Sequence, residues 1–436
     1  MIASDGQGHI NPEGQALLPL IPIPYTTSEQ AGWERGLLGP SKVRLAPRTG
    51  MALSLNDARV VIRGGYGVFL NQWAYSVQTA LSRNLPFFFT RQVDVPADQH
   101  VPSSQTRTVL TSDPTGVVSP QIMDHAYAVE YTQTWSGGFQ YEVRPSAAVE
   151  VFYMGSWTRG ADNATVHNVP EPGPGSIQAR RPIPQLGAIR SIRFDGKSIY
   201  HAVTVRAERR LRSHVAYTVS YTRSTSKDDA SSPGPTEAET NFPQNVRNIF
   251  DKTGEWANSS FDHRHLFVAS ATYELPSFEG LATLGEAVLG GWRVNAVVSL
   301  QSGAPFTVNL GVDQANIGPG PSQRPNQLHD PNLAAVERTP ERWFDTSAFA
   351  LQAPFTFGDA PRNSVIGPGY ATTDLAIAKT WTFADSKRLE VRWEIFNLFN
   401  TTNFDLPNRI FGTPNFGRIF SAKSPREMQL GVKVSF

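Results

Sequence analysis

The sequence predicts an all-β fold, an antiparallel up-and-down β-barrel that crosses a membrane on its strands. Two observations predict it. Segments that alternate apolar and polar residues recur along the 436 residues, as expected for strands with one apolar and one polar face. The links between them alternate between short and long, which is typical of a barrel with tight turns at one end. The final strand is the clearest: Met428, Leu430, Val432, Val434 and Phe436 share one face.

About eleven strands are expected, most of them ten to fourteen residues long. A tilted strand needs roughly 9–11 residues to cross a bilayer, so these lengths are sufficient. In one of them Leu389, Val391, Trp393 and Ile395 alternate with charged residues. The predicted strands are 43–55, 59–69, 131–143, 146–157, 198–211, 214–222, 263–275, 291–302, 370–383, 388–400 and 426–436.

The links indicate which end of the barrel faces outward. If the C-terminus lies in the periplasm, counting back along the strands places every long link on the extracellular side. Short links are expected at 56–58, 144–145, 212–213 and 384–387, with a moderate one at 276–290. The long links are 70–130, 158–197, 223–262, 303–369 and 401–425.

Composition excludes several classes of protein. The formal net charge is +1, so the balance of charge gives no reason to expect nucleic-acid binding. The chain has no cysteine, which excludes disulfides, thiolate metal sites and cysteine nucleophiles. It has no run of eighteen apolar residues that would form a transmembrane helix. No signal-peptide pattern is visible at the N-terminus.

Two clusters of charged or metal-binding side chains invite a chemical interpretation. His263 and His265 share a strand face and could ligate a metal, but a site needs three or four ligands, and a polar strand start at the rim is the better interpretation. Glu390 and Glu394 could act as paired carboxylates in a hydrolase. They share their row with Arg388 and Arg392, a pattern that indicates a self-neutralising lumen wall. We therefore predict no metal, no cofactor and no enzymatic activity.

The longest loop offers aromatic side chains for ligand contact. Trp343, Phe344 and Phe349 could stack on a sugar or an aromatic solute. The alternative is that these rings pack the loop against itself, and it is favoured.

From about Leu45 onward the sequence resembles the C-terminal barrel region of TonB-dependent outer-membrane receptors. The nearest group is the Oar-like one, which often carries an N-terminal carboxypeptidase-regulatory-like domain. The matching segments, in order, are Ala46–Gly50, Val61–Phe69, Phe261–His265, Gly290–Val294, Gln301–Phe306, Trp343–Phe349, Phe357–Asn363, Gly367–Gly369, Glu394–Asn400, Pro414–Gly417 and Ser424–Gln429.

The resemblance implies half of a 22-stranded barrel in the outer membrane of a Gram-negative bacterium. Residues 1–42 would be a loop-like lead-in and residues 43–436 the C-terminal part of the barrel. Such receptors need a signal peptide, a TonB-contacting box and a plug domain, and none precedes Met1, so we expect a fragment that is not competent for transport alone.

The resemblance also implies the partners. These are outer-membrane lipid, the barrel-assembly machinery, TonB through a plug domain, and a large imported solute, for which an oligosaccharide and a peptide are the candidates. The last strand, with Leu430, Val432, Val434 and Phe436, would carry the assembly signal. Arg388, Glu390, Arg392 and Glu394 would line the lumen.

Two other functions stay open at this point. One is a structural or adhesive surface protein that uses the barrel as an anchor. The other is a soluble, secreted β-rich carbohydrate-binding protein or hydrolase.

Overall fold

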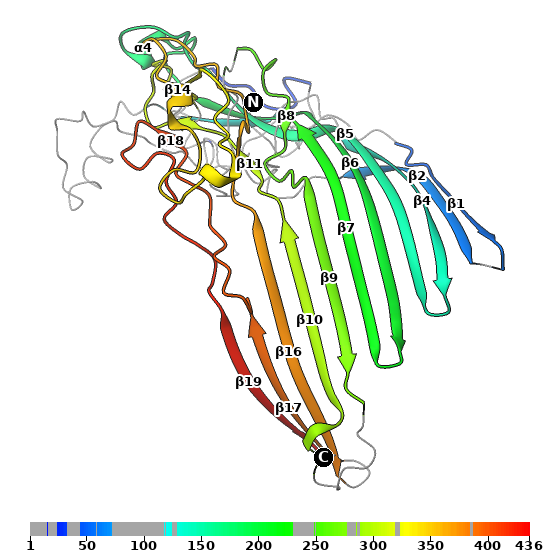
Figure 1. Cartoon of the computed structure of the whole chain (residues 1–436). Coiled ribbons are helices and arrows are strands. Elements are labelled where there is room, and N and C mark those ends of the chain that lie inside the picture. Colours follow the sequence, from blue (N-terminus) through cyan, green and yellow to red (C-terminus); the bar gives the residue numbers. More distant parts are fainter. Residues whose placement is uncertain are drawn as a thin grey trace.

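The protein forms one large antiparallel sheet with irregular loops gathered at one end of its strands (Figure 1). The computed structural model describes residues 15, 24–32, 44–57, 59–71, 117, 119–123, 129–229, 248, 250–276, 285, 288–318, 323–383 and 387–436. Eleven strands follow one another across the sheet in sequence order, and each is antiparallel to its neighbour. Within the described residues the first and last of them pair on one side only, so the sheet is open.

These strands confirm the predicted fold class, and each coincides with a predicted segment. Their bounds are β1 Arg48–Leu55, β2 Val60–Asn71, β4 Glu130–Arg144, β5 Ala147–His167, β6 Ile189–Arg212, β7 Val215–Asp228, β9 His265–Glu274, β10 Trp292–Gln301, β16 Tyr370–Phe383, β17 Lys387–Phe396 and β19 Glu427–Ser435.

Three central strands are longer than the sequence predicts, which corrects two of the long links. β5 has 21 residues and β6 has 24, so the link expected at 158–197 shrinks to 168–188. β7 likewise continues to Asp228. The register between β5 and β6 shifts on both sides of Ala161, as at a β-bulge. A bulge interrupts the two-residue period, so the continuation of these strands is not visible as simple alternation.

Tight turns join the strands at the opposite end of the sheet, where the C-terminus also lies (Figure 1). Asn56 and Asp57 both have positive φ, 52° and 50°, in the turn between β1 and β2. Ser213 and His214 have φ of 51° and 68° between β6 and β7. Ser213 and His214 lie between the paired residues Arg212 and Val215, so their two consecutive positive φ values are the geometry of a type I′ hairpin turn, which matches the twist of the adjoining strands.

Register divides the sheet into an apolar face and a polar face. Across β17 and β19, Val391 lies opposite Val432 and Trp393 opposite Leu430 on the apolar face. The intervening positions, beginning with Glu390 opposite Lys433, form the polar face. The apolar face continues across β16 with residues such as Ile377, the partner of Trp393.

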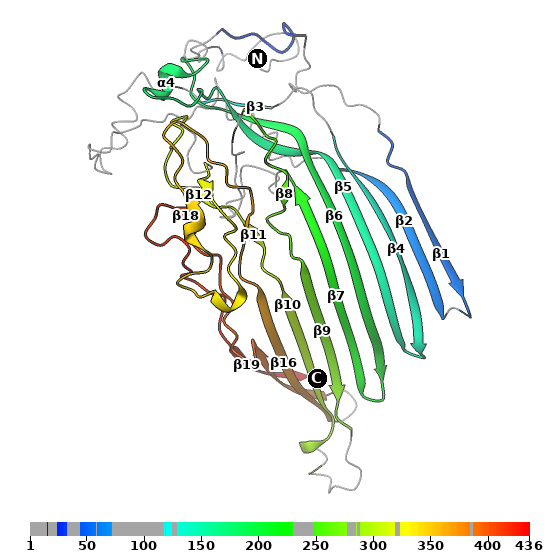
Figure 2. The same ribbon diagram turned by 45° about the horizontal axis from the view of Figure 1, so that its top comes forward.

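The long links pack into one body at the other end, here called the loop cap: residues 168–188, 250–264, 302–318, 323–369 and 397–426 (Figure 2). Within the described part of the chain, every helix falls short of the length and apolar character that spanning a bilayer requires. The short elements are α4 Ile177–Arg180, β8 Ala257–Asn258, β11 Pro305–Phe306, β12 Asn309–Leu310, β13 Asn326–Gln327, η4 Ala335–Glu337, η5 Thr346–Ala348, β14 Phe349–Ala350, β15 Val365–Ile366 and β18 Ile410–Phe411, with β3 Gln121–Met123 beside β6.

Candidate functional site: the loop cap and the two faces of the sheet

An aromatic core holds the loop cap together. Phe344 contacts three other rings edge-on, at centroid distances of 5.9 Å to Phe306, 6.0 Å to Phe349 and 5.1 Å to Phe416. Phe306 and Phe416 come from different long links, which β12 and β18 also join by parallel pairing. Edge-to-face contact between buried rings is a favourable aromatic geometry. These two long links therefore share one hydrophobic core.

Two of the three loop aromatics named as candidates for ligand contact are buried in the aromatic core. Phe344 is 1% exposed and Phe349 is 5% exposed, so their faces are covered by protein. Trp343 packs against the same core, and its Nε1 donates to the carbonyl oxygen of Ile366 at 2.9 Å. All three rings thus pack within the loop cap, and their contact with a solute stays a prediction.

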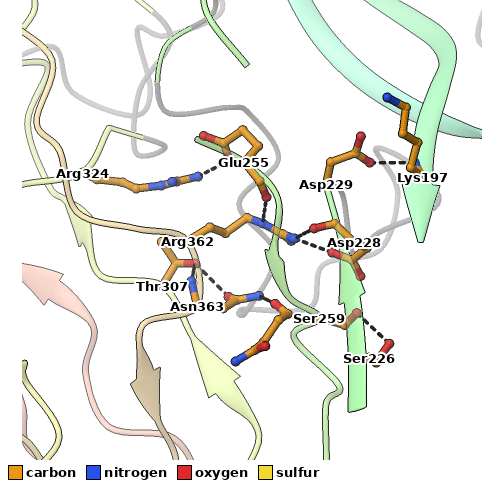
Figure 3. A network of polar contacts seen from close by, with 11 residues as sticks. Lys197, Ser226, Asp228, Asp229, Glu255, Ser259, Thr307, Arg324, Arg362 and Asn363 are labelled. Carbon is orange, nitrogen blue, oxygen red and sulfur yellow. Dashed lines mark hydrogen bonds and ion pairs between the residues drawn. The ribbon is translucent and has the colours of Figure 1, made fainter. Parts of the chain in front are cut away.

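Two buried arginine–carboxylate pairs lie where the loop cap meets the end of the sheet, and one of them, Arg362 with Asp228, joins the cap to the sheet (Figure 3). Arg362 pairs with Asp228 at the end of β7, and its Nε donates to the carbonyl oxygen of Glu255 at 3.0 Å. Arg324 pairs with the Glu255 carboxylate at 2.6 Å. We call Asp228, Glu255, Arg324, Arg362 and Asn363 the polar anchor.

Asn363 extends the polar anchor toward β8. Its Nδ2 donates to the carbonyl oxygen of Asn258 at 2.7 Å, while its Oδ1 accepts from the Thr307 hydroxyl at 2.9 Å. Its φ of 54° is left-handed, a conformation that asparagine adopts more readily than most residues. Ser226 and Ser259 share a further buried hydrogen bond of 2.8 Å close by (Figure 3). The side-chain amide of Asn363 thus ties residues 303–369 to the link that follows β7.

Because the polar anchor is buried, its intact ion pairs add little net stability, but breaking one of them is costly. The four charged side chains are between 0% and 3% exposed. Removing water from two charges offsets most of their mutual attraction, so such a pair adds little net stability. Removing one partner leaves a buried charge and costs about 3–5 kcal/mol. The anchor therefore specifies where the loop cap sits on the sheet.

The histidines considered as metal ligands serve as loop supports. The Nδ1 of His263 shares a hydrogen bond of 2.7 Å with the carbonyl oxygen of Ser302, and the Nδ1 of His265 shares one of 2.6 Å with the Tyr221 hydroxyl. Asp262 accepts from the backbone nitrogen of Ser226 at 2.8 Å. Among the described residues, no three His, Cys, Asp or Glu side chains gather as a metal site requires.

Among the described carboxylates of the loop cap whose pKa is lowered, Asp345 shows the large displacement. Hydrogen bonds from His329, Ser347 and Arg342, with His329 the largest contribution, hold the pKa of Asp345 well below its usual range. The His329 Nε2 lies 3.1 Å from the Asp345 Oδ2. Asp345 also caps η5, since its carboxylate accepts from the Ser347 backbone nitrogen.

The four charged residues predicted to line the lumen form one row on the polar face. Glu390 and Glu394 flank Arg392, at 3.4 Å and 3.3 Å from its guanidinium nitrogens. Glu394 also hydrogen-bonds Gln429 across to β19. The residues predicted as the assembly signal lie at the end of the chain. Leu430, Val432 and Val434 occupy every second position on the apolar face of β19, and Phe436 lies just beyond the strand and is 95% exposed.

A band of aromatic and histidine side chains crosses the apolar face below the loop cap. Its members are Trp135, Tyr153, Trp157, His201, Tyr221 and His265, which we call the aromatic belt. The Trp135 Nε1 donates to the Tyr153 hydroxyl at 3.2 Å, and that hydroxyl shares a 2.8 Å hydrogen bond with His201. Side chains that combine an aromatic ring with a polar group are favoured at the boundary between hydrocarbon and water.

A lysine stands on the apolar face near the turn end of the sheet. Lys379 is 5% exposed, and its ammonium lies 5.7 Å and 5.3 Å from the ring centroids of Trp292 and Trp381. It donates to the carbonyl oxygen of Gly290. Sequence reasoning missed Lys379, because a lysine in an alternating strand gives no sign of the two rings that cover it.

The polar anchor was also missed. The segments Phe261–His265 and Phe357–Asn363 were recognised only as markers of resemblance, and nothing in them indicates that Arg362 reaches β7. The sequence feature that could have indicated the polar anchor is the presence of charged residues within long loops that are otherwise rich in glycine and proline.

An eleven-stranded up-and-down sheet with one apolar and one polar face, capped by loops at one end, is the wall of an outer-membrane β-barrel. The family described as "Outer membrane beta barrel domain" matches residues 4–429, and the chain belongs to this family. The protein is therefore located in the outer membrane of a Gram-negative bacterium. This location overturns the soluble, secreted alternative.

Solved structures similar to the chain include an outer membrane transporter, an iron transporter and an import receptor. The outer membrane transporter YddB from Escherichia coli is 10% identical, with a TM-score of 0.47 over 87% of this chain and 39% of that one. The FrpB iron transporter from Neisseria meningitidis, F3-3 variant, is 12% identical, with a TM-score of 0.42 over 89% and 39%. The ferric-catecholate import receptor Fiu from E. coli K12 is 11% identical, with a TM-score of 0.39 over 89% and 34%.

The chain thus spans between 34% and 39% of the length of these three proteins. No curated protein matches it.

Proposed function

We propose that the chain forms the C-terminal half of the barrel of a TonB-dependent receptor that imports a large solute. The observation that carries the proposal is the unbroken series of eleven antiparallel strands with a packed loop cap at one end only. Family membership supports the barrel. The ordered motifs from Ala46 to Gln429 support the TonB-dependent class and, within it, an Oar-like receptor with a carboxypeptidase-regulatory-like domain.

The parity of the strands supports a half-barrel. Ten successive antiparallel pairings separate β1 from β19, so these two edge strands run in the same direction. They cannot pair with each other in an antiparallel ladder. An antiparallel closed barrel needs an odd number of further strands between them, and hydrocarbon does not tolerate an open edge. In this proposal residues 43–436 supply one arc of the wall and residues 1–42 a lead-in.

We propose that the polar face lines the lumen and that the apolar face meets lipid. The row Arg388, Glu390, Arg392 and Glu394 would then face water around a plug, and that plug would make the contact with TonB. The loop cap would be extracellular and would be the first part of the receptor that a solute meets. Leu430, Val432, Val434 and Phe436 would present the final strand to the barrel-assembly machinery.

Cysteine labelling tests the assignment of the two faces. The chain has no cysteine, so single-cysteine variants report one position each. In intact outer membranes, a water-soluble maleimide should label cysteine at Glu390 and Glu394 and spare cysteine at Val391 and Trp393. All four positions lie on β17, so each pair controls for the other. If only the cysteines at Val391 and Trp393 were labelled, the apolar face would be the one exposed to water and the proposed assignment of the faces would be wrong.

Gene deletion in the native host tests import. Fluorescent oligosaccharides of graded length and fluorescent peptides are offered to wild-type cells, the deletion strain, and a strain with inactive TonB. One solute class should accumulate in wild-type cells and fail to accumulate in both mutants. If the deletion strain loses surface attachment while uptake of every solute stays normal, the structural or adhesive alternative holds and import is rejected.

A further inference from the structure

Four cations stand on the apolar face of the sheet: Arg223 and Lys227 lie level with rings of the aromatic belt, and Arg159 and Lys197 lie on its loop side. Arg159 lies opposite Lys197 across β5 and β6. Arg223 and Lys227 stand on the same face of β7, opposite Val203 and Ile199 of β6. All four side chains are exposed. We call Arg159, Lys197, Arg223 and Lys227 the basic cluster.

The basic cluster is not neutralised by ion pairs. In the described part of the chain, no carboxylate lies within ion-pair distance of any of its four side chains, although twelve such pairs occur elsewhere. Of the nearby acids, Asp195 is engaged by two other cations. Asp229 accepts from the backbone nitrogen of Lys197 and also attracts the charge of Lys197, but it does not reach ion-pair distance. On the polar face, by contrast, Arg206 and Arg392 are paired with glutamates. The four cations of the basic cluster therefore stand on the apolar face without the glutamate partners that Arg206 and Arg392 have on the polar face.

The basic cluster follows the aromatic belt in the same order on two strands. Along β5 the apolar-face positions run from Val151 through Tyr153 and Trp157 to Arg159, and the Arg159 guanidinium lies 4.1 Å from the Trp157 ring centroid. Along β7 they run from Val219 through Tyr221 to Arg223. Each strand thus presents apolar, then aromatic, then cationic side chains. A lipid lying along the strand would meet them with its hydrocarbon chain, its glycerol or sugar region and its phosphate, in that order.

We propose that the basic cluster binds the phosphate groups of an anionic glycolipid in the outer leaflet of the outer membrane. An arginine fork and a lysine ammonium both donate hydrogen bonds to phosphate oxygens, and the aromatic belt holds the lipid's apolar part beside them. The cluster lies on the face that this barrel turns to lipid, so a lipid is the occupant that reaches it. The proposal rests on the outer-membrane location and on the proposed assignment of the apolar face to lipid. It needs neither TonB nor import, so a failure of lipid binding would leave the import proposal standing.

Lipid titration of the purified full chain in a neutral detergent tests the proposal. The probes are bisphosphorylated lipid A, its monophosphorylated form and inorganic phosphate, and binding is followed by tryptophan fluorescence. Wild-type protein should bind the bisphosphorylated lipid at least tenfold more tightly than the monophosphorylated one, and affinity should fall as salt rises. The variant R159Q/K197Q/R223Q/K227Q should lose at least tenfold in affinity.

A matched control removes the same number of charges from the polar face. The variant R63Q/R206Q/R392Q/K433Q should bind lipid within twofold of wild type. The pair R223Q/K227Q, at two exposed positions on one strand, gives a second measurement if the quadruple variant does not fold, with at least a threefold loss expected. Equal lipid affinity in wild type and the basic-cluster variants would overturn the proposal, as would inorganic phosphate competing at concentrations similar to the lipid.

Discussion

The guanidinium of Arg362 lies against the carboxylate of Asp228, although 134 residues separate them in the chain. Each side chain is only 2% exposed. The contact joins the loop between β10 and β16 to the end of β7, which lies two strands away from β10 in the sheet. One ion pair thus fixes the position of the largest loop over the sheet.

Loss of Arg362 should loosen the loop cap while leaving the sheet intact. Arg362→Met leaves the Asp228 carboxylate buried without its guanidinium, a change that costs about 3–5 kcal/mol. Hydrogen exchange in residues 250–264 and 355–369 should then accelerate about a hundredfold or more. The strands β16 and β17 should keep their protection.

Two further variants control the Arg362 experiment. Arg342→Met removes an exposed ion pair of 3.2 Å with Asp345, and such pairs contribute about 0–1 kcal/mol. The double variant Arg362→Met/Asp228→Leu removes both buried charges and should regain most of the lost protection. Equal exchange rates in the Arg362→Met single variant and the wild type would show that the pair does not hold the cap.

A glycine in β5 should resist substitution because a tryptophan lies across it. A Cβ built on Gly155 would stand 2.4–2.7 Å from the ring of Trp135, its cross-strand partner. Gly155→Ala should therefore destabilise the sheet by about 1–3 kcal/mol, as overpacking does. Urea unfolding followed by gel mobility measures the change.

The matched control is Gly137→Ala on the adjacent strand. A Cβ at Gly137 meets one backbone oxygen at 4.0 Å, so this substitution should be tolerated. In a Trp135→Leu background the penalty of Gly155→Ala should shrink. If both glycine variants are equally stable, the packing of Trp135 on Gly155 is not what excludes a side chain there.

Acid should weaken the loop cap through Asp345. Hydrogen bonds from His329, then Ser347 and Arg342, lower its pKa in the folded protein. A lowered folded pKa contributes stability that is complete above the unfolded value of about 3.9 and is lost as the pH falls toward the folded value. In the Asp345→Asn variant, the backbone amides of the loop cap should therefore be less protected from hydrogen exchange than in wild type at pH 7. The difference in protection between variant and wild type should narrow below about pH 4. A constant difference at every pH would contradict this origin.

The sequence predicted the strands well, because the two-residue period is a local property that each segment carries by itself. All eleven strands of the sheet and its up-and-down order follow from that pattern. The bulge at Ala161 hid the continuation of β5 and β6, since one extra residue reverses the alternation.

The loop cap could be predicted only as a set of long links. Whether Phe344 lies in a core or on a surface depends on Phe306 and Phe416, which arrive from other parts of the chain. The partner of Arg362 likewise depends on the path of a loop and on no local pattern. Burial of this kind is a tertiary property that no local sequence pattern reveals.

The two edges of the sheet should not cross-link to each other. β1 and β19 run in the same direction, so no antiparallel ladder can join them within one chain or between two copies inserted in the same orientation. Cysteines introduced at Met51 and Val432, both on the apolar face, should give no disulfide in outer membranes under mild oxidation. Val391 and Val432 are direct cross-strand partners, so cysteines at this pair should cross-link and provide the positive control. A disulfide between positions 51 and 432 would mean that the eleven strands close on themselves, and would reject the half-barrel.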